Sequence, residues 1–170
     1  IDYNTTGGIG TNTDGWSVED NLQIAVFATG AKFAPHVDGN VLATRNFTVD
    51  VLQRNASTTL FTFTSLPDAQ QEIPITIVTL LEGTYDLLVH SPSFLKEKIH
   101  DVVITSSAVI TLPALRGGDF NNDGVINEID WSFMNPRWFS TDSTADLNGD
   151  GVVNSVDFSY MNRNWNAVGN

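Results

Sequence analysis

Oxygen-bearing side chains recur at fixed spacing in two segments near the end of the chain. Within residues 119–130 they occupy positions 1, 3, 5, 9 and 12 of a twelve-residue loop with glycine at position 6, and residues 146–157 repeat this pattern. Carboxylate, amide and carbonyl oxygens in such a loop suit Ca²⁺, whereas Mg²⁺ prefers a smaller octahedral shell. The spacing therefore predicts two calcium ions, one in each loop.

Each loop position predicts a different kind of ligand. We expect side-chain oxygens at positions 1, 3 and 5, a backbone carbonyl at 7, a water-mediated contact at 9 and a closing carboxylate at 12. In the first loop these are Asp119, Asn121, Asp123, Val125, Asn127 and Asp130. In the second loop they are Asp146, Asn148, Asp150, Val152, Asn154 and Asp157. Gly124 and Gly151 lie at position 6, where the sharp turn disfavours a Cβ atom.

The repeat extends beyond the loops into the segments that follow them. Residues 119–140 and 146–167 are identical at 11 of 22 aligned positions, where unrelated segments would share about one or two. Both following segments have apolar residues at i, i+3 and i+7, which predicts two helices with a shared core. These residues are Trp131, Met134 and Trp138 in one copy and Phe158, Met161 and Trp165 in the other. Pro136 is expected to shorten or kink the first helix.

The composition limits the class of partner. Eight basic and twenty acidic residues give a formal net charge of −12, which argues against nucleic acids and anionic membrane surfaces as partners. There is no cysteine and no apolar run long enough for a membrane span. The chain starts at Ile1 rather than Met, so we expect a processed or excised polypeptide. Loops of this kind with low affinity suit the calcium-rich space outside the cell.

The first two thirds of the chain have a β pattern. Residues 1–21 are rich in Gly, Thr, Asn and Asp and predict an extended arm. Residues 22–115 contain short runs of β-branched and aromatic residues separated by turn residues, which predicts a β-sandwich domain. The expected strands are 22–29, 47–53, 58–64, 73–81, 85–90, 99–104 and 109–112. Residues 116–118 should form a boundary or tight connector at the start of the repeat domain, which spans 116–170.

One strand of this domain resembles a known family. The segment Leu81-Glu82-Gly83-Thr84-Tyr85-Asp86-Leu87 is similar to the "PGTYDV" strand of transthyretin-like, carboxypeptidase-regulatory-like domains, with Glu82 where Pro is usual. The Tyr85 hydroxyl is expected to close a corner of the sandwich by a hydrogen bond to backbone. The overall fold class is thus mainly β plus small α: an immunoglobulin-like or transthyretin-like sandwich followed by two helices.

The repeat resembles the dockerin type I module rather than calmodulin, because each EF-hand-like loop has a following helix but no proper entering helix. The resemblance covers residues 118 to about 167 and implies calcium-dependent docking onto a β-sandwich partner of the cohesin type. In dockerins, partner choice depends on loop positions 10 and 11 and on the late part of the following helix. Here the corresponding residues are Glu128, Ile129, Ser155, Val156, Asn162 and Arg163. They differ from the common Ser-Thr pair, so we expect a specialised partner rather than a standard cellulosomal cohesin.

Two functions are compatible with these features. The first is a non-catalytic, secreted or cell-surface assembly protein that docks onto a partner or onto another copy of itself, head to tail, as a filament or tube. The alternative is a carbohydrate-binding or accessory module of a secreted, cellulosome-like polysaccharide-degrading enzyme. No catalytic motif appears, and the three histidines lack metal-type spacing, so we do not expect an enzyme. Glycosylation triplets begin at Asn4, Asn46 and Asn55, although such triplets also arise by chance in a chain rich in Thr and Asn.

Overall fold

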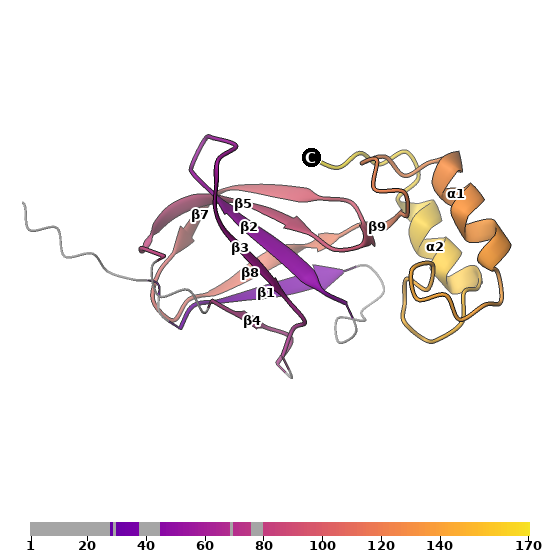
Figure 1. Cartoon of the computed structure of the whole chain (residues 1–170), viewed down its shortest axis with the longest axis horizontal. Helices are drawn as coiled ribbons and strands as arrows, with labels where there is room; N and C mark the ends of the chain where they lie inside the picture. The colour runs from indigo at the N-terminus through magenta and orange to yellow at the C-terminus, as the bar shows by residue number, and fades with distance from the viewer. Residues whose placement is uncertain (1–27, 29, 38–44, 69, 76–79) are drawn as a thin grey trace, which may run out of the picture.

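A β-sandwich carries a small helical part at one end (Figure 1). In this computed structural model the described residues are 28, 30–37, 45–68, 70–75 and 80–170. The predicted arm at residues 1–21 and nearly all of the predicted strand at 22–29 lie outside them. The rest of the fold class, mainly β with two short helices, is confirmed.

The sandwich consists of two sheets. One has the strand order β4-β1-β8 and the other has the order β3-β2-β5-β7. Their bounds are β1 Lys32–Val37, β2 Phe47–Leu52, β3 Thr59–Ser65, β4 Ile73–Pro74, β5 Gly83–His90, β7 Glu97–Ile104 and β8 Val109–Leu115. A further two-stranded pair joins β6 (Ser93–Phe94) to β9 (Gly117–Asp119).

Alternating side chains build the core between the sheets. On β2, Phe47, Val49 and Val51 are fully buried while the residues between them are not, as expected for a strand with one face on the core. Phe33 of β1 meets Phe63 of β3 edge to face, with 5.6 Å between the ring centroids. Because these strands belong to different sheets, this aromatic pair joins the two layers.

The sequence analysis missed strand β1. Lys32–Val37 contains Pro35 in its middle, and proline is normally a sign against a paired strand. The structure pairs β1 with β8 in parallel and shifts the register between Ala34 and His36. Pro35 therefore lies at an irregularity, where the missing N–H does not interrupt the ladder.

Two other expectations need correction. The predicted strand at 73–81 is described as a strand only at Ile73–Pro74, and residues 76–79 lie outside the described part of the chain. Within the predicted boundary or connector at residues 116–118, Gly117 and Gly118 form the start of β9, which pairs antiparallel with β6, and Arg116 separates it from β8. The predicted corner is confirmed, because the Tyr85 hydroxyl donates to the Leu81 carbonyl at 2.8 Å.

The helical part contains α1 (Glu128–Met134), the 3-10 turn η1 (Asn135–Arg137) and α2 (Ser155–Arg163). Pro136 lies inside η1, which confirms that it shortens the first helix. Met134 and Met161 are fully buried, and the rings of Trp131 from α1 and Phe158 from α2 lie 4.9 Å apart. Neither helix is long and apolar enough to cross a membrane, as judged on the described residues.

Candidate calcium-binding loops

Three acidic side chains converge in the first loop. It starts at the end of β9 and leads into α1, so Asp119 comes from a strand and Asp130 from a helix. Asp119, Asp123 and Asp130 each have a carboxylate oxygen within 4.8 Å of the others. Because Ca²⁺ binds oxygens at about 2.3–2.6 Å, one ion can contact all three. Gly124, with φ +85°, provides the sharp turn between them.

Backbone N–H groups hold the carboxylates at positions 1 and 12. Asp119 accepts from the N–H groups of Asp123 at 3.1 Å and Gly124 at 3.2 Å. Asp130 accepts from Phe120 at 2.7 Å and, through its other oxygen, from Asn127 at 2.9 Å. Both carboxylates are buried. The loop is therefore wrapped around its first and last acidic residues.

The second loop repeats this arrangement. Asp146 accepts from the N–H groups of Gly149 at 2.7 Å and Gly151 at 2.8 Å. Asp157 accepts from Asn148 at 3.0 Å and Asn154 at 2.8 Å. Gly151 adopts φ +92°, close to the value at Gly124. The duplication seen in the sequence thus extends to the hydrogen bonds that shape each loop.

Positions 3 and 5 also match between the copies, whereas position 7 makes different contacts in each. The Asn121 amide donates to Asp123 and the Asn148 amide donates to Asp150, each at 2.8 Å. At position 7, Val125 forms an isolated β-bridge with Val168, whereas the carbonyl of Val152 accepts from the Asn154 side chain at 3.0 Å. The polar groups of positions 3 and 5 therefore face each other in both loops.

The asparagines at position 9 have a role that the sequence analysis did not predict. The Asn127 side-chain oxygen accepts from the N–H of Ile129, and that of Asn154 accepts from Val156, both at 2.7 Å. Each asparagine is the N-cap of its helix, in a capping box completed by the aspartate at position 12. The signal was present as Asn-x-x-Asp before an amphipathic segment. These residues therefore link the end of each loop to the start of each helix.

The electrostatics of both loops favour a bound cation. Burial raises the pKa of Asp119, and the carboxylates of Asp130 and Asp123 raise it further, against the hydrogen bond from Gly124. Burial likewise raises the pKa of Asp157, with Asp146 and Asp150 adding to the effect. Acidic groups crowded in this way are costly without a counter-charge. A bound Ca²⁺ would supply that charge, so the predicted ligands fit the ion.

The predicted partner-binding residues are all exposed. They lie at the first turns of α1 and α2 and at the end of α2: Glu128, Ile129, Ser155, Val156, Asn162 and Arg163. Ile129 and Val156 are 53% and 43% exposed at equivalent positions of the two copies. Single exposed apolar residues are common, but here the duplication presents one at the start of each helix.

Phe139 is an exposed aromatic residue that the sequence analysis did not single out. Its side chain is 78% exposed, and its backbone adopts φ +64°, which is unusual for a bulky residue. The backbone N–H of Phe139 donates to Val153 at 2.8 Å, which fixes this conformation. The exposed ring of Phe139 thus adds apolar surface to the helical part of the molecule.

The three glycosylation triplets remain predictions. Asn46 and Asn55 are exposed, before β2 and in the turn after it. Asn4 lies outside the described residues.

Comparisons with known proteins identify the C-terminal part. The family model of the dockerin type I domain matches residues 117–166. A structural relative is a chain of the type II cohesin-X-dockerin complex from Acetivibrio cellulolyticus, a C-terminal interface mutant, with a TM-score of 0.64 and 21% identity. That match covers 82% of this chain and 97% of that chain. An N-terminal interface mutant of the complex gives a TM-score of 0.56 and 19% identity over the same shares of the two chains.

The structural match extends beyond the loops and helices, because 82% of 170 residues is far more than residues 117–166. At these identities the likeness concerns the fold. No match was found among curated proteins. Residues 117–166 are therefore a dockerin type I domain, and a β-sandwich precedes it.

Proposed function

We propose that this protein docks onto a β-sandwich partner of the cohesin type through the exposed starts of α1 and α2. The observation that carries the proposal is the pair Ile129 and Val156, two exposed apolar side chains at equivalent positions of the dockerin domain. Apolar residues held on rigid helix ends suit the central contacts of a protein interface. The cohesin complexes among the structural relatives support a partner of this class.

Dockerin domains bind calcium, and we propose that this one binds two ions. The support is that both loops share the same acidic positions and the same backbone hydrogen bonds. Ion binding would fix the loops from which both helices start. Docking is therefore expected to depend on calcium.

The proposed role is non-catalytic and extracellular. Cohesin-dockerin systems act outside the cell or at its surface, and this chain carries no sequence motif of a known catalytic site. The alternative role as a carbohydrate-binding module is less well supported. Among the described residues of the sandwich, its aromatic side chains are buried or half-buried: Phe33, Phe47, Phe61, Phe63, Tyr85 and Phe94. A stacking platform for sugars would need exposed rings.

A binding assay with type I and type II cohesin modules tests the docking role. Isothermal titration calorimetry should show binding in calcium and none in excess chelator. Charges placed at the proposed contacts by I129D and V156D together should weaken binding at least tenfold. The control is V103D, at an exposed residue of the sandwich. Equal binding by all variants, or binding that survives chelation, would contradict the proposal.

We further propose that a second copy can serve as the partner. Among the described strands, β3 is at the edge of its sheet, and Thr59–Ser65 contains neither a charged residue nor a proline, the features that usually protect an edge. A head-to-tail contact between unlike surfaces would produce a filament. Electron microscopy and sedimentation in calcium and in chelator test this, since monomers under both conditions would exclude it.

A further inference from the structure

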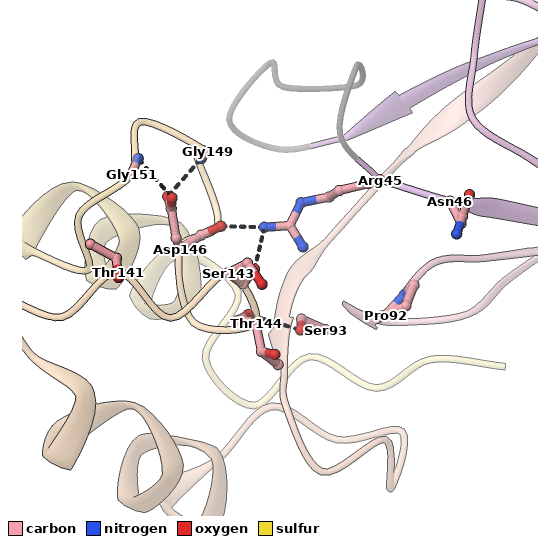
Figure 2. Close-up of a pocket in the computed structure, with 10 residues that line it drawn as sticks. All are labelled: Arg45, Asn46, Pro92, Ser93, Thr141, Ser143, Thr144, Asp146, Gly149 and Gly151. Atoms are coloured by element: carbon pink, nitrogen blue, oxygen red, sulfur yellow. Dashed lines mark hydrogen bonds between the residues drawn. The ribbon is translucent and has the colours of Figure 1, made fainter.

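The sandwich contacts the start of both loops, and Figure 2 shows the contacts of Arg45 and Ser93 with the second loop and the residues just before it. The backbone of Ser93 on β6 is paired with Asp119, which is position 1 of the first loop. On the other side, the Ser93 hydroxyl donates to the carbonyl of Thr144 at 2.9 Å, two residues before Asp146. Ser93 is buried and adopts φ +69°. Ser93 is thus bonded through its backbone to the first residue of the first loop and through its side chain to a residue just before the second loop.

Arg45, from the segment before β2, makes the second contact. Its guanidinium donates to the carbonyl of Asp146 and lies 3.5 Å from that of Ser143. It also lies over the ring of Phe94, 5.1 Å from the centroid. Arg45 is 9% exposed. A side chain of the sandwich therefore crosses the junction and ends on the backbone of the first ligand of the second loop.

The burial of Arg45 is costly, which indicates that its position is maintained by its contacts. Burial lowers its pKa, although the charges of Asp146 and Asp157 oppose this. Its Nε atom has no hydrogen-bond partner within the described structure. An arginine at the surface, such as Arg54 beside Asp101, avoids this cost.

We propose that Arg45 and Ser93, here called the junction pair, are positioning residues that couple the calcium affinity of the dockerin domain to the sandwich. This inference rests on the proposed binding of calcium. The carboxylate of Asp146 is held by Gly149 and Gly151, and its backbone carbonyl is held by Arg45. A ligand fixed at both ends loses less conformational freedom when the ion binds.

The coupling must act in both directions. If the junction pair favours the ion-bound loop, calcium favours the junction contacts by the same factor. Calcium would then stabilise the attachment of the dockerin domain to the sandwich as well as the loop itself. The positive charge of Arg45 acts against this, because it repels a nearby cation. Replacing Arg45 by a neutral residue therefore distinguishes the two effects. Lost positioning would weaken calcium binding, whereas lost repulsion would strengthen it.

The serine contact can be tested with a matched pair of variants in the full chain. Ser93→Ala removes the bond to Thr144, and Ser91→Ala removes an equal bond of 2.9 Å to Asn46 that stays inside the sandwich. Calorimetric calcium titration should show that Ser93→Ala weakens at least one of the two binding steps about fivefold, as expected for one net hydrogen bond. Ser91→Ala should leave both steps unchanged. An equal effect, or none in either variant, would overturn the proposal.

Arg45→Met tests positioning against charge. If positioning dominates, the variant binds calcium about fivefold or more weakly, and Arg45→Lys recovers part of the loss because it retains a charged donor. Unchanged or tighter binding by Arg45→Met would overturn the proposal. Arg54→Met, after the opposite end of β2, is the control.

Thermal unfolding distinguishes coupling from a general loss of stability. The two serine variants should melt at similar temperatures in chelator, whereas in calcium Ser93→Ala should melt lower. A wild-type chain that binds no calcium would refute the proposed calcium binding itself. A wild type that binds, with Ser93→Ala and Arg45→Met unaffected, would refute only the coupling.

Discussion

At the scale of single residues, buried carboxylates organise both parts of the molecule. In the sandwich, Asp86 is fully buried at the register shift of β5. It accepts from the backbone N–H groups of Asn55 and Asp101, both at 3.2 Å, and lies 3.0 Å from the His100 ring nitrogen. Asp86 thus joins the turn after β2 to β7, as Asp130 and Asp157 join the ends of their loops.

Asp86 should make the stability of the sandwich depend on pH. Burial alone would raise the pKa of Asp86, but the N–H of Asp101, the His100 ring and the N–H of Asn55 together hold it below its usual range. A lowered pKa gives stability that is present above the unfolded value of about 3.9 and is lost as the pH falls through the folded value. Denaturant unfolding in calcium should therefore show a shallower loss of stability below about pH 4 for Asp86→Asn.

The control for this measurement is Asp101→Asn. The Asp101 carboxylate is half exposed and pairs with Arg54 at the surface, where ion pairs contribute little. This variant should retain the acid dependence of the wild type. The same dependence in Asp86→Asn would show that other groups control acid unfolding.

At the scale of elements, the sequence predicted strands and helices best where their pattern was regular. The approximate positions of β2, β3, β5, β7 and β8 followed from alternating apolar residues. Strand β1 was missed because Pro35 obscured it, and β9 was missed because Gly117 and Gly118 are typical of turns. These two strands, and the short β6, which was also missed, are defined by the strands they pair with. Such pairing is a tertiary interaction, which local propensity does not determine.

Gly118 of β9 should be among the least replaceable residues at the domain junction. It adopts φ +126°, and an added Cβ would lie 3.0 Å from the Met161 side chain and 3.2 Å from its backbone. Gly118→Ala combines backbone strain with a clash against α2 and should cost about 3 kcal/mol in denaturant unfolding.

The matched variant is Gly30→Ala. Gly30 has φ +78°, but an added Cβ would make only an ordinary contact with Ser107 at 3.5 Å. It should cost only the backbone strain, about 1 kcal/mol. Equal losses in the two variants would mean that the packing of β9 against α2 contributes nothing measurable.

At the scale of the whole molecule, the final residues connect the first loop to the sandwich. Gly169 donates to Gly124 at 2.9 Å, and Asn170 donates to the carbonyl of Lys96 at 3.0 Å. Arg116 also donates to Val168 at 2.9 Å. These contacts and the junction pair could not be predicted from the sequence, because their members are far apart in the chain. By contrast, the ligand positions could be predicted because each loop is contiguous.

Removing these terminal contacts should lower the thermal stability of the whole molecule. A chain ending at Asn166 loses several net hydrogen bonds of about 1 kcal/mol each, which should lower the melting temperature in calcium by about 5–10 °C. Scanning calorimetry in calcium and in chelator measures the effect. We expect the melting temperatures in calcium and in chelator to differ less for the shortened chain than for the full chain. An unchanged melting curve in calcium would show that the terminal contacts are not stabilising.

The two loops are copies in sequence but are attached to the sandwich by different means. The first begins within a β-strand pairing, Ser93 with Asp119, which depends on backbone groups present at almost every residue. The second is held by two side chains, those of Arg45 and Ser93, and a single substitution can remove either. If the dockerin domain were transplanted to another host, the first attachment would require a host strand with a free edge. The second would require only two correctly placed side chains, so it is the easier one to install, remove or retune.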